Sequence, residues 1–407
     1  MNRVVITGMG IWSCLGTSLD EVRDSLYMGR SGIIFSQERK DAGYRSALVG
    51  NVPKADLKPL LPRKSRTFMP EEAEYAYMAT LQALEHAHLD ADYLASHEVG
   101  IIYGNDSVVE ETMIACDKFR EAKNTLACGG SAIFKSMNSN ITMNLACLFH
   151  LRGINLTASS ACSSGSQSIG LAALLIGNGL QDCVVCGGAE ENNIYSVASF
   201  DGIQTFSTRE DEPTKASRPF DAQRDGLVPS GGGATLILES YEHAVRRGAP
   251  ILAEIVGWGF SGNGDHIANP NVEGPARSLE LCLKNSGIDP RRIGYINAHA
   301  TSTVIGDQRE AEAIARIFGE RTVPVTSTKS QTGHEMWMAG ASEVIYSTLM
   351  MQNGFIAGNV NFENPDDITA RLNILPETRH TGFDMFLSNS FGFGGTNSPL
   401  IVKAFRE

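Results

Sequence analysis

Short runs of β-branched and apolar residues alternate with helix-periodic segments along most of the chain. In the first half the strand-like runs lie at residues 4–11, 99–105, 154–160 and 182–188, and residues 71–89 have the apolar spacing of an amphipathic helix. The alternation starts again late in the chain, with strand-like runs at residues 251–262, 294–301, 323–329 and 384–391. Such alternation predicts parallel or mixed sheets covered by helices, and hence an α/β fold.

The restart divides the chain into two halves. At 407 residues the chain is too long for one small core, so two fused α/β halves are the natural expectation. The glycine-bearing segment "RRGAP" at residues 246–250 marks the boundary. We therefore predict an N-terminal half over residues 1–250 and a C-terminal half over residues 251–407.

The composition is that of an ordinary soluble protein, with 20% charged and 42% apolar residues. No uninterrupted apolar run reaches the roughly 20 residues that span a bilayer, and the chain begins with a strand-like run instead of a signal pattern. Cys183 and Cys186 form a C-x-x-C, but they lie in a strand-like run without a second pair to complete a zinc site. These features predict a cytoplasmic protein with no metal, no membrane contact and no nucleic-acid partner.

Cys162 lies between the strand-like run at 154–160 and an apolar-periodic helix at 165–180. At such a strand-to-helix turn the thiolate is favoured by the positive end of the helix dipole and by free backbone N–H groups. The small neighbours in "SSACSSGS" leave room for a bulky acyl group at the sulfur. From this segment alone, a buried structural cysteine remains the alternative.

Two histidines, His299 and His334, each follow a strand-like run in a segment rich in glycine, threonine and serine. The ends of strands are where α/β sheets place their chemistry. Near the C-terminus, residues 391–395 put a glycine-rich turn between two apolar runs, and its backbone N–H groups can meet a developing oxyanion. A nucleophilic cysteine, two imidazoles and such a turn together suit acyl transfer through a thioester.

The chain resembles the β-ketoacyl-[acyl-carrier-protein] synthases of the elongating type, most closely the synthase I branch of the thiolase-like superfamily. The motifs that carry the resemblance are "NRVVITGMGI", "SSACSSGSQSIG", "GGAEE", "RPFDAQRDGLV" and "SNSFGFGGTN", and they run from one end of the chain to the other. The resemblance implies a duplicated thiolase-like fold with five layers, α-β-α-β-α. The nucleophile would come from the first half and both histidines from the second.

The resemblance also implies the reaction, a decarboxylative Claisen condensation of an acyl chain with malonyl-[acyl-carrier protein] in fatty-acid elongation. Cys162 would carry the acyl chain, while His299 and His334 would stabilise the malonyl enolate. Lys329 would organise the site, and Glu343 matches the position of its carboxylate partner in the family. Backbone N–H groups of Cys162 and Phe393 would hold the tetrahedral oxyanion, and the Phe393 side chain would act as a gate for acyl chains.

The family pattern assigns supporting roles to further positions. Substrate binding is expected from Thr301, Thr303, Phe200, Ser107, Gly394 and Gly395. Loop support is expected from Asp307 and Glu310. Some family members have been described with a monovalent cation near the positions of Asn297, Glu343, Ser388 and Asn389, although we expect no metal as part of the chemistry.

The implied partner is an acyl carrier protein, which brings its own phosphopantetheine, so we expect no cofactor bound to the chain itself. Malonyl and acyl thioesters are the implied substrates. A net charge of −12 gives little attraction for an acidic carrier, so docking needs a local basic patch. The candidates for that patch are Arg63, Lys64, Arg66, Lys118, Arg120 and Lys123.

The resemblance further implies a dimer, either a homodimer or a heterodimer with a chain-length-factor-like subunit. In the family the helix at 165–180 and the strand at 183–191 pair across a two-fold axis, and the neighbourhoods of Ser107 and Met137 close the acyl pocket of the partner subunit. The expected interface buries well over about 2,000 Å².

The chain departs from the family pattern around the reactive residues. Ala300 replaces a residue that is usually glycine, and Asp106, next to Ser107, is unusual for its position. The segment "TGHEMWMAGASE" places Trp337 and Met338 where the family has glycine and alanine. Trp337 either abuts the active site or fills a gap in helix packing. These departures leave the acyl chain open, so a ketosynthase of a polyketide or aryl-polyene pathway is the alternative function.

Overall fold

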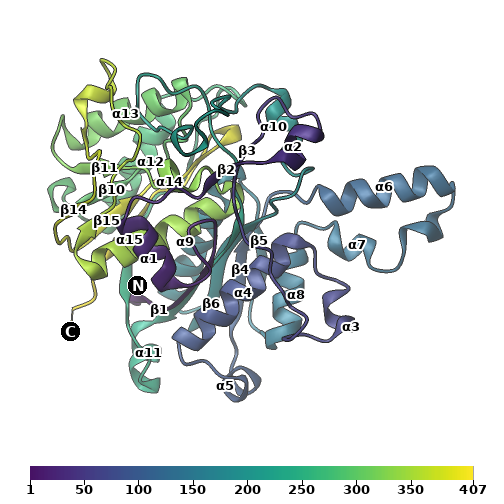
Figure 1. Ribbon diagram of the computed structural model, residues 1–407. Helices are drawn as coiled ribbons and strands as arrows, with labels where there is room; N and C mark the ends of the chain where they lie inside the picture. The colour runs from purple at the N-terminus through teal and green to yellow at the C-terminus, as the bar shows by residue number, and fades with distance from the viewer. Residues whose placement is uncertain (407) are drawn as a thin grey trace.

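The protein is described here by a computed structural model covering residues 1–406, and a single mixed sheet of 11 strands runs through it (Figure 1). The strands that come from the first half of the chain are β1 (Val4–Trp12), β4 (Gly100–Gly104), β5 (Asn155–Ala158), β6 (Cys183–Glu190) and β7 (Gly232–Ser240). The second half contributes β8 (Ala253–Trp258), β10 (Tyr295–Asn297), β11 (Pro324–Thr326), β13 (Asn373–Ile374), β15 (Met385–Ser388) and β18 (Leu400–Lys403).

The strand order shows that the two halves repeat one topology. Outward from the middle of the sheet the first half runs β1-β7-β6-β4-β5, and the second runs β8-β18-β15-β10-β11 with β13 added at the edge. In both series the first two pairings are antiparallel and the next two are parallel. The halves join where Val4–Ile6 of β1 pairs antiparallel with Ala253–Ile255 of β8.

Helices cover both outer faces of this arrangement and fill the space between the halves. Helices α4 (Glu71–His86) and α8 (Asn140–Phe149) cover the first-half strands, and α12 (Glu273–Ser286) and α13 (Val304–Phe318) cover the second-half strands. Helices α9 (Ser164–Gly177) and α15 (Ala339–Asn353) pack against each other in the middle. The expected five layers, α-β-α-β-α, are confirmed. The first-half strands and the second-half strands of the large sheet form the two β layers, and three buried apolar clusters lie between the layers.

Glycines in β1 let the first outer helix lie directly on the sheet. A Cβ at Gly10 would come within 2.0 Å of the Ala79 carbonyl oxygen of α4, and one at Gly8 within 2.2 Å of the Ala83 carbonyl oxygen. Only a residue without a side chain fits there, which explains why β1 reads "VVITGMGIW".

The remaining elements, most of them short, lie around this core. The helices are α1 (Leu19–Tyr27), α2 (Gln37–Asp41), α3 (Arg63–Arg66), α5 (Ala91–Ser96), α6 (Glu110–Ala122), α7 (Ala132–Lys135), α10 (Ala198–Gly202), α11 (Tyr241–Arg247) and α14 (Lys329–Thr332). Three small sheets are formed by β2 (Ile33–Phe35) with β3 (Leu48–Gly50), by β12 (Phe355–Ile356) with β14 (Arg379–His380), and by β16 (Phe391–Gly392), β17 (Thr396–Asn397) and β9 (Ser261–Gly262).

The sequence pattern located most strands of the large sheet but missed two, the short edge strand β13 and the long central strand β7. Its nine buried residues, Gly232–Ser240, include the β-branched and apolar run "ATLILE" that could have marked it. The run expected at 251–262 is divided into β8 and β9, and the run at 294–301 ends as a strand at Asn297. The chain leaves the sheet there, and this exit releases His299 from strand pairing.

The expectation about which elements lie open to a partner subunit was wrong. Strand β6 pairs on both sides, with β4 and β7, and α9 lies between the two halves of its own chain. The strand at the edge is β5 instead, and its Leu156 side chain is 46% exposed.

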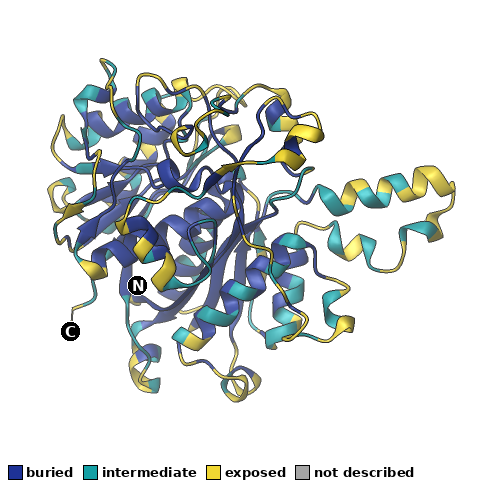
Figure 2. Ribbon diagram, viewed as in Figure 1, coloured by how far each residue is buried: buried dark blue, intermediate teal, exposed yellow. Residues whose placement is uncertain are grey.

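In the segment between β4 and α8, α6 and α7 project from the body as an arm (Figure 1), and Figure 2 shows how much of it is exposed. We use "arm" for residues 110–139. Its exposed apolar side chains are Met113, Phe119, Leu126, Ile133, Phe134 and Met137. Over residues 1–406 the structure has no helix that is both long and apolar enough to cross a membrane.

Candidate active site

The turn that carries Cys162 is held in a strained conformation. Cys162 lies in the 3-10 helix η2 (Ala161–Ser163), which leads directly into α9, and Ala161 has a positive φ of 51°. The Ser164 hydroxyl donates to the Ala161 carbonyl (2.7 Å), and the Ser163 hydroxyl donates to the Thr396 carbonyl (2.8 Å). Strain of this kind persists only where the surroundings impose it, as is typical of reactive sites.

Both histidines reach this turn from the second half of the chain. The rings of His299 and His334 lie edge to face, with centroids 5.3 Å apart. The Cys162 sulfur and one nitrogen of each ring all lie within 4.8 Å of one another. The fold therefore brings together three residues that are 137 and 35 positions apart in the sequence.

Lys329 lies buried beside these three residues. Its ammonium group forms an ion pair with the Glu343 carboxylate of α15, and both side chains are almost fully buried. Burial raises the pKa of Glu343 to about 8, although Lys329 opposes that shift. The cation is thus held in place by a partner from the central helix layer.

The surroundings keep both imidazoles neutral. Burial, and then the positive charge of Lys329, hold the pKa values of His299 and His334 well below their ordinary range. Within residues 1–406, neither Nδ1 of His299 nor either ring nitrogen of His334 has a hydrogen-bond partner. Each ring can therefore offer a neutral N–H group to a substrate oxygen.

Burial of Cys162 opposes the thiolate that the helix end was expected to favour. Burial raises the pKa of Cys162 to about 12. The charge of Lys329 and the backbone N–H groups of Phe393 and Cys162 act in the opposite direction, whereas the Asp106 carboxylate raises the pKa further. Desolvation outweighs the helix-end effect because the thiol is only 6% exposed.

The glycine-rich turn lies directly over the nucleophile. Phe393 begins the 3-10 helix η7 (Phe393–Gly395), and Gly394 and Gly395 have positive φ values of 77° and 74°. The Phe393 ring is 40% exposed and stacks on Phe200 of α10, with centroids 5.9 Å apart. A Cβ at Gly395 would lie 2.6 Å from the Cβ of Asn263, so this turn requires glycine.

Glu310 fixes the backbone that carries His299. Its Oε1 accepts from the backbone N–H of His299 (2.8 Å) and from the Asn389 amide (2.8 Å), and its Oε2 accepts from the backbone N–H of Ala300 (2.7 Å). Burial raises the pKa of Glu310, and these hydrogen bonds oppose the shift. The carboxylate therefore ties the backbone of His299 and Ala300 to α13 and to Asn389.

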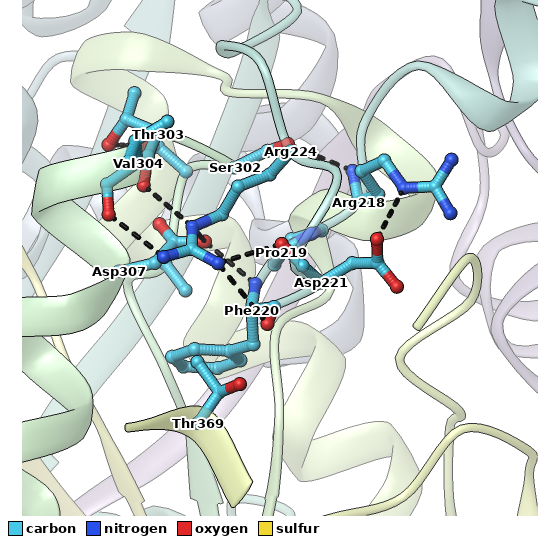
Figure 3. Close-up of polar contacts among 12 residues, drawn as sticks. Arg218, Pro219, Phe220, Asp221, Arg224, Ser302, Thr303, Val304, Asp307 and Thr369 are labelled. Carbon is cyan, nitrogen blue, oxygen red and sulfur yellow. Dashed lines mark hydrogen bonds and ion pairs between the residues drawn. The ribbon is translucent and has the colours of Figure 1, made fainter. Parts of the chain in front are cut away.

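Arg224 braces the next turn of the same loop (Figure 3). Its guanidinium donates to the carbonyls of Thr303 (3.2 Å) and Val304 (2.9 Å), and it lies 3.8 Å from the Asp307 carboxylate. Asp307 in turn accepts from the backbone N–H of Phe220 (2.7 Å), which has a positive φ of 67°. Burial raises the pKa of Asp307 to about 7.

Arg218 adds a second brace that the sequence reasoning did not assign. Its backbone N–H donates to the Ser302 hydroxyl (3.0 Å), and its guanidinium donates to Asp221 (3.1 Å). Ser302 has a positive φ of 71°. Arg218 and Arg224 both lie in "RPFDAQRDGLV", one of the motifs that carry the family resemblance. The residues near them in the sequence do not indicate which distant groups the two guanidinium groups bind.

The remaining expected substrate contacts lie around the same site. The hydroxyls of Thr301 and Thr303 are 3.1 Å apart on the braced loop. Ser107 lies on the segment between β4 and α6, next to Asp106, whose carboxylate accepts from the Ser159 hydroxyl. Trp337 belongs to the buried apolar cluster that contains Cys162, so it lies near the active site and also contributes to packing.

The expected docking residues lie on two neighbouring surface elements. Arg63, Lys64 and Arg66 form most of α3, where Arg66 donates to the Leu61 carbonyl (3.1 Å). Phe68, just after α3, packs edge to face on Phe134 of the arm at 5.6 Å. The exposed Lys118, Arg120 and Lys123 lie on or just after α6 of the same arm.

Two sets of side chains have donors suited to a metal ion. Cys162, His299 and His334 offer the sulfur and nitrogen ligands that zinc prefers, but the nearby charge of Lys329 opposes a divalent cation there. Glu343 Oε2, Ser388 Oγ and Asn389 Oδ1 are buried and lack partners within residues 1–406, and oxygen ligands of this kind fit a monovalent cation. The absence of a metal from the chemistry stays a prediction.

Comparisons with known proteins cover the whole chain. Residues 1–244 match the family model "Beta-ketoacyl synthase, N-terminal domain", and residues 252–363 match "Beta-ketoacyl synthase, C-terminal domain". The chain is 41% identical to 3-oxoacyl-[acyl-carrier-protein] synthase 1 of Escherichia coli (strain K12), with 100% of both chains covered.

Solved structures give the same result. A β-ketoacyl synthase from Burkholderia phymatum superposes with a TM-score of 0.95 at 37% identity, and the ishigamide ketosynthase/chain length factor superposes with a TM-score of 0.92 at 28% identity. Each comparison covers 100% of both chains.

Proposed function

The chain belongs to the β-ketoacyl synthase family, and from this membership we propose how its residues carry out the reaction. The chain is an acyltransferase that elongates fatty acyl chains by decarboxylative condensation with malonyl-[acyl-carrier protein]. The similarity to a synthase 1 over the full length favours this function over a polyketide or aryl-polyene ketosynthase.

The observation that carries the proposal is the convergence of one thiol and two neutral imidazoles within 4.8 Å. The Cys162 sulfur attacks the thioester carbonyl of acyl-[acyl-carrier protein]. The carrier thiol leaves with the proton that Cys162 gives up, and the acyl chain remains on the sulfur. The phosphopantetheine arm belongs to the carrier, so the chain needs no cofactor of its own.

The second half-reaction forms the carbon–carbon bond. The bond between the malonyl methylene and its carboxylate breaks, carbon dioxide leaves, and the electron pair becomes an enolate. N–H groups of His299 and His334 stabilise the enolate oxygen because both rings are neutral. The enolate carbon attacks the acyl–Cys162 carbonyl, and the tetrahedral oxyanion is held by the backbone N–H groups of Cys162 and Phe393. The sulfur then leaves and takes up one proton.

The test combines mass spectrometry with matched variants. Incubation with acyl-[acyl-carrier protein] should add the acyl mass to the peptide that contains Cys162, and Cys162→Ala should abolish this addition while Cys282→Ala does not. His299→Ala and His334→Ala should each slow malonyl decarboxylation by about 100- to 1000-fold, the usual effect of losing one oxyanion donor. The exposed His97→Ala is the control. An acyl group on another cysteine would overturn the assignment.

The carrier protein should dock on α3 and the arm, because these neighbouring elements combine exposed basic side chains on an otherwise acidic molecule. Charge reversal at Arg63 and Lys64 should raise the KM for the carrier protein most strongly at low salt. Arg246→Glu on α11 is the matched control. Equal KM values at low salt for both variants would contradict this surface.

The functional unit is a homodimer built across the β5 edge, with a chain-length-factor-like partner as the alternative. Support comes from the place of β5 as the last strand of the sheet and from the exposed apolar side chains on the adjacent arm. Analytical ultracentrifugation of the purified chain tests this. A stable, active monomer would contradict it, and an insoluble chain rescued by a second gene product would favour the heterodimer.

A further inference from the structure

The segment between His334 and α15 is anchored and strained. Met336 has a positive φ of 44°, which is unusual for a residue with a side chain. The Glu335 carboxylate, immediately before it, accepts hydrogen bonds from the hydroxyls of Ser342 (2.5 Å) and Tyr346 (2.7 Å) on α15. These hydrogen bonds tie the backbone just before Trp337 to α15.

Trp337 is held against the element that carries the nucleophile. The 3-10 helix η5 (Met336–Met338) packs on η2, and a Cβ at Gly165 would lie 2.9 Å from the Trp337 carbonyl oxygen. The Trp337 side chain is 6% exposed and shares a buried apolar cluster with Cys162. The sulfur that would carry an acyl chain therefore lies in the same buried cluster as the Trp337 side chain.

One polar atom of this cluster has no partner. The indole Nε1 of Trp337 is buried, and within residues 1–406 no acceptor forms a hydrogen bond with it. The other polar aromatic group of the cluster, the Tyr44 hydroxyl, donates to the Ile194 carbonyl at 2.6 Å. Elsewhere in the chain, Nε1 of Trp12 donates to the Pro53 carbonyl at 2.6 Å. Buried indole N–H groups usually find an acceptor, so this donor calls for one.

We propose that the Trp337 N–H is a specificity-determining donor for an oxygen atom of the acyl chain on Cys162. The enzyme would thus prefer acyl chains that carry a hydroxyl, carbonyl or ether oxygen over hydrocarbon chains of the same shape. A hydrocarbon chain leaves the donor buried without a partner, whereas an oxygen at the right position pairs with it. This inference rests on the proposed function, in which Cys162 holds the acyl chain as a thioester.

The test uses pairs of acyl-[acyl-carrier protein] substrates of equal length. In each pair one CH2 group is replaced by oxygen, at successive positions along the chain, and kcat/KM is measured for acylation of Cys162 and for condensation. The wild-type enzyme should favour the oxygen-containing chain at one position by about 10- to 100-fold. Trp337→Phe keeps an aromatic ring but removes the N–H, so the chain oxygen loses its partner and the ratio should fall to one or below.

Trp258→Phe on β8 makes the same chemical change outside the cluster and should keep the wild-type ratio. No preference at any position in the wild-type enzyme would overturn the inference, and this measurement does not depend on a variant that folds. An equal loss for both members of a pair in Trp337→Phe would also overturn it, because the donor would then serve a group that all substrates share. Failure of every chain to acylate Cys162 would refute the proposed function instead.

Discussion

Glu310 offers the sharpest test of how the fold positions a catalytic imidazole. Its two carboxylate oxygens accept three hydrogen bonds, from the backbone N–H groups of His299 and Ala300 and from the Asn389 side chain, over 2.7–2.8 Å. In Glu310→Gln one oxygen becomes an NH2 group, and in its best orientation it faces the N–H of Ala300. One buried donor then loses its acceptor, and two donors point at each other.

The cost follows from these contacts. Leaving a buried N–H group unpaired destabilises a protein by about 1–3 kcal/mol. The loop can escape this cost only by moving, and a displacement of about 1 Å at a reacting group lowers a rate by about 100-fold. Glu310→Gln should therefore lose about 1–3 kcal/mol of unfolding free energy and about 100-fold in malonyl decarboxylation. Glu310→Ala should lose more of both, because all three hydrogen bonds disappear.

The assay is urea unfolding of each variant beside its malonyl decarboxylation rate. Glu312→Gln on the same helix is the matched control, since Glu312 makes only a partly exposed ion pair with Arg309 at 3.3 Å and should cost less than about 1 kcal/mol. If Glu310→Gln unfolded within about 0.5 kcal/mol of wild type and kept its rate, Glu310 would not hold the His299 loop, and the reasoning would be refuted.

Three further predictions concern charges near the nucleophile. In Lys329→Met, loss of the cation should raise the pKa values of Cys162 and His334. The pKa of Cys162 is measured by iodoacetamide alkylation of its peptide as a function of pH, and that of His334 by NMR titration. Unchanged profiles would contradict the electrostatic role of Lys329. Asp106→Asn should move the Cys162 alkylation profile in the opposite direction, to lower pH, because the carboxylate raises that pKa; no shift would show that the charge is screened. Burial raises the pKa of Glu335 from its ordinary 4.5 to about 7, so the folded state holds a proton that the unfolded chain releases in this interval, and unfolding free energy should fall as pH rises through it. Glu335→Gln should remove this part of the slope in urea unfolding at about pH 5 and about pH 8, and equal slopes would refute the assignment.

Features with a local cause were predictable from the sequence alone. The alternation of strand-like and helix-periodic segments predicted an α/β fold, because side-chain periodicity follows directly from backbone geometry. The turn around Cys162 and the strand ends before His299 and His334 were recognisable for the same reason, since small residues and strand exits are visible in a few consecutive positions. The motifs then identified the family and pointed to Lys329 and Glu343.

Other features depend on which distant segments meet, so they became visible only in the folded chain. The pairing of β1 with β8, the exposure of β5 rather than β6, and the brace of Arg224 on the Thr303 turn join residues dozens to hundreds of positions apart. The pKa of Cys162 belongs to the same class. The helix end that favours the thiolate is a local feature, but burial is produced by the whole fold, and here desolvation outweighs it. The Trp337 N–H is likewise unpaired because of its surroundings, since the indole N–H of an exposed tryptophan would donate a hydrogen bond to water.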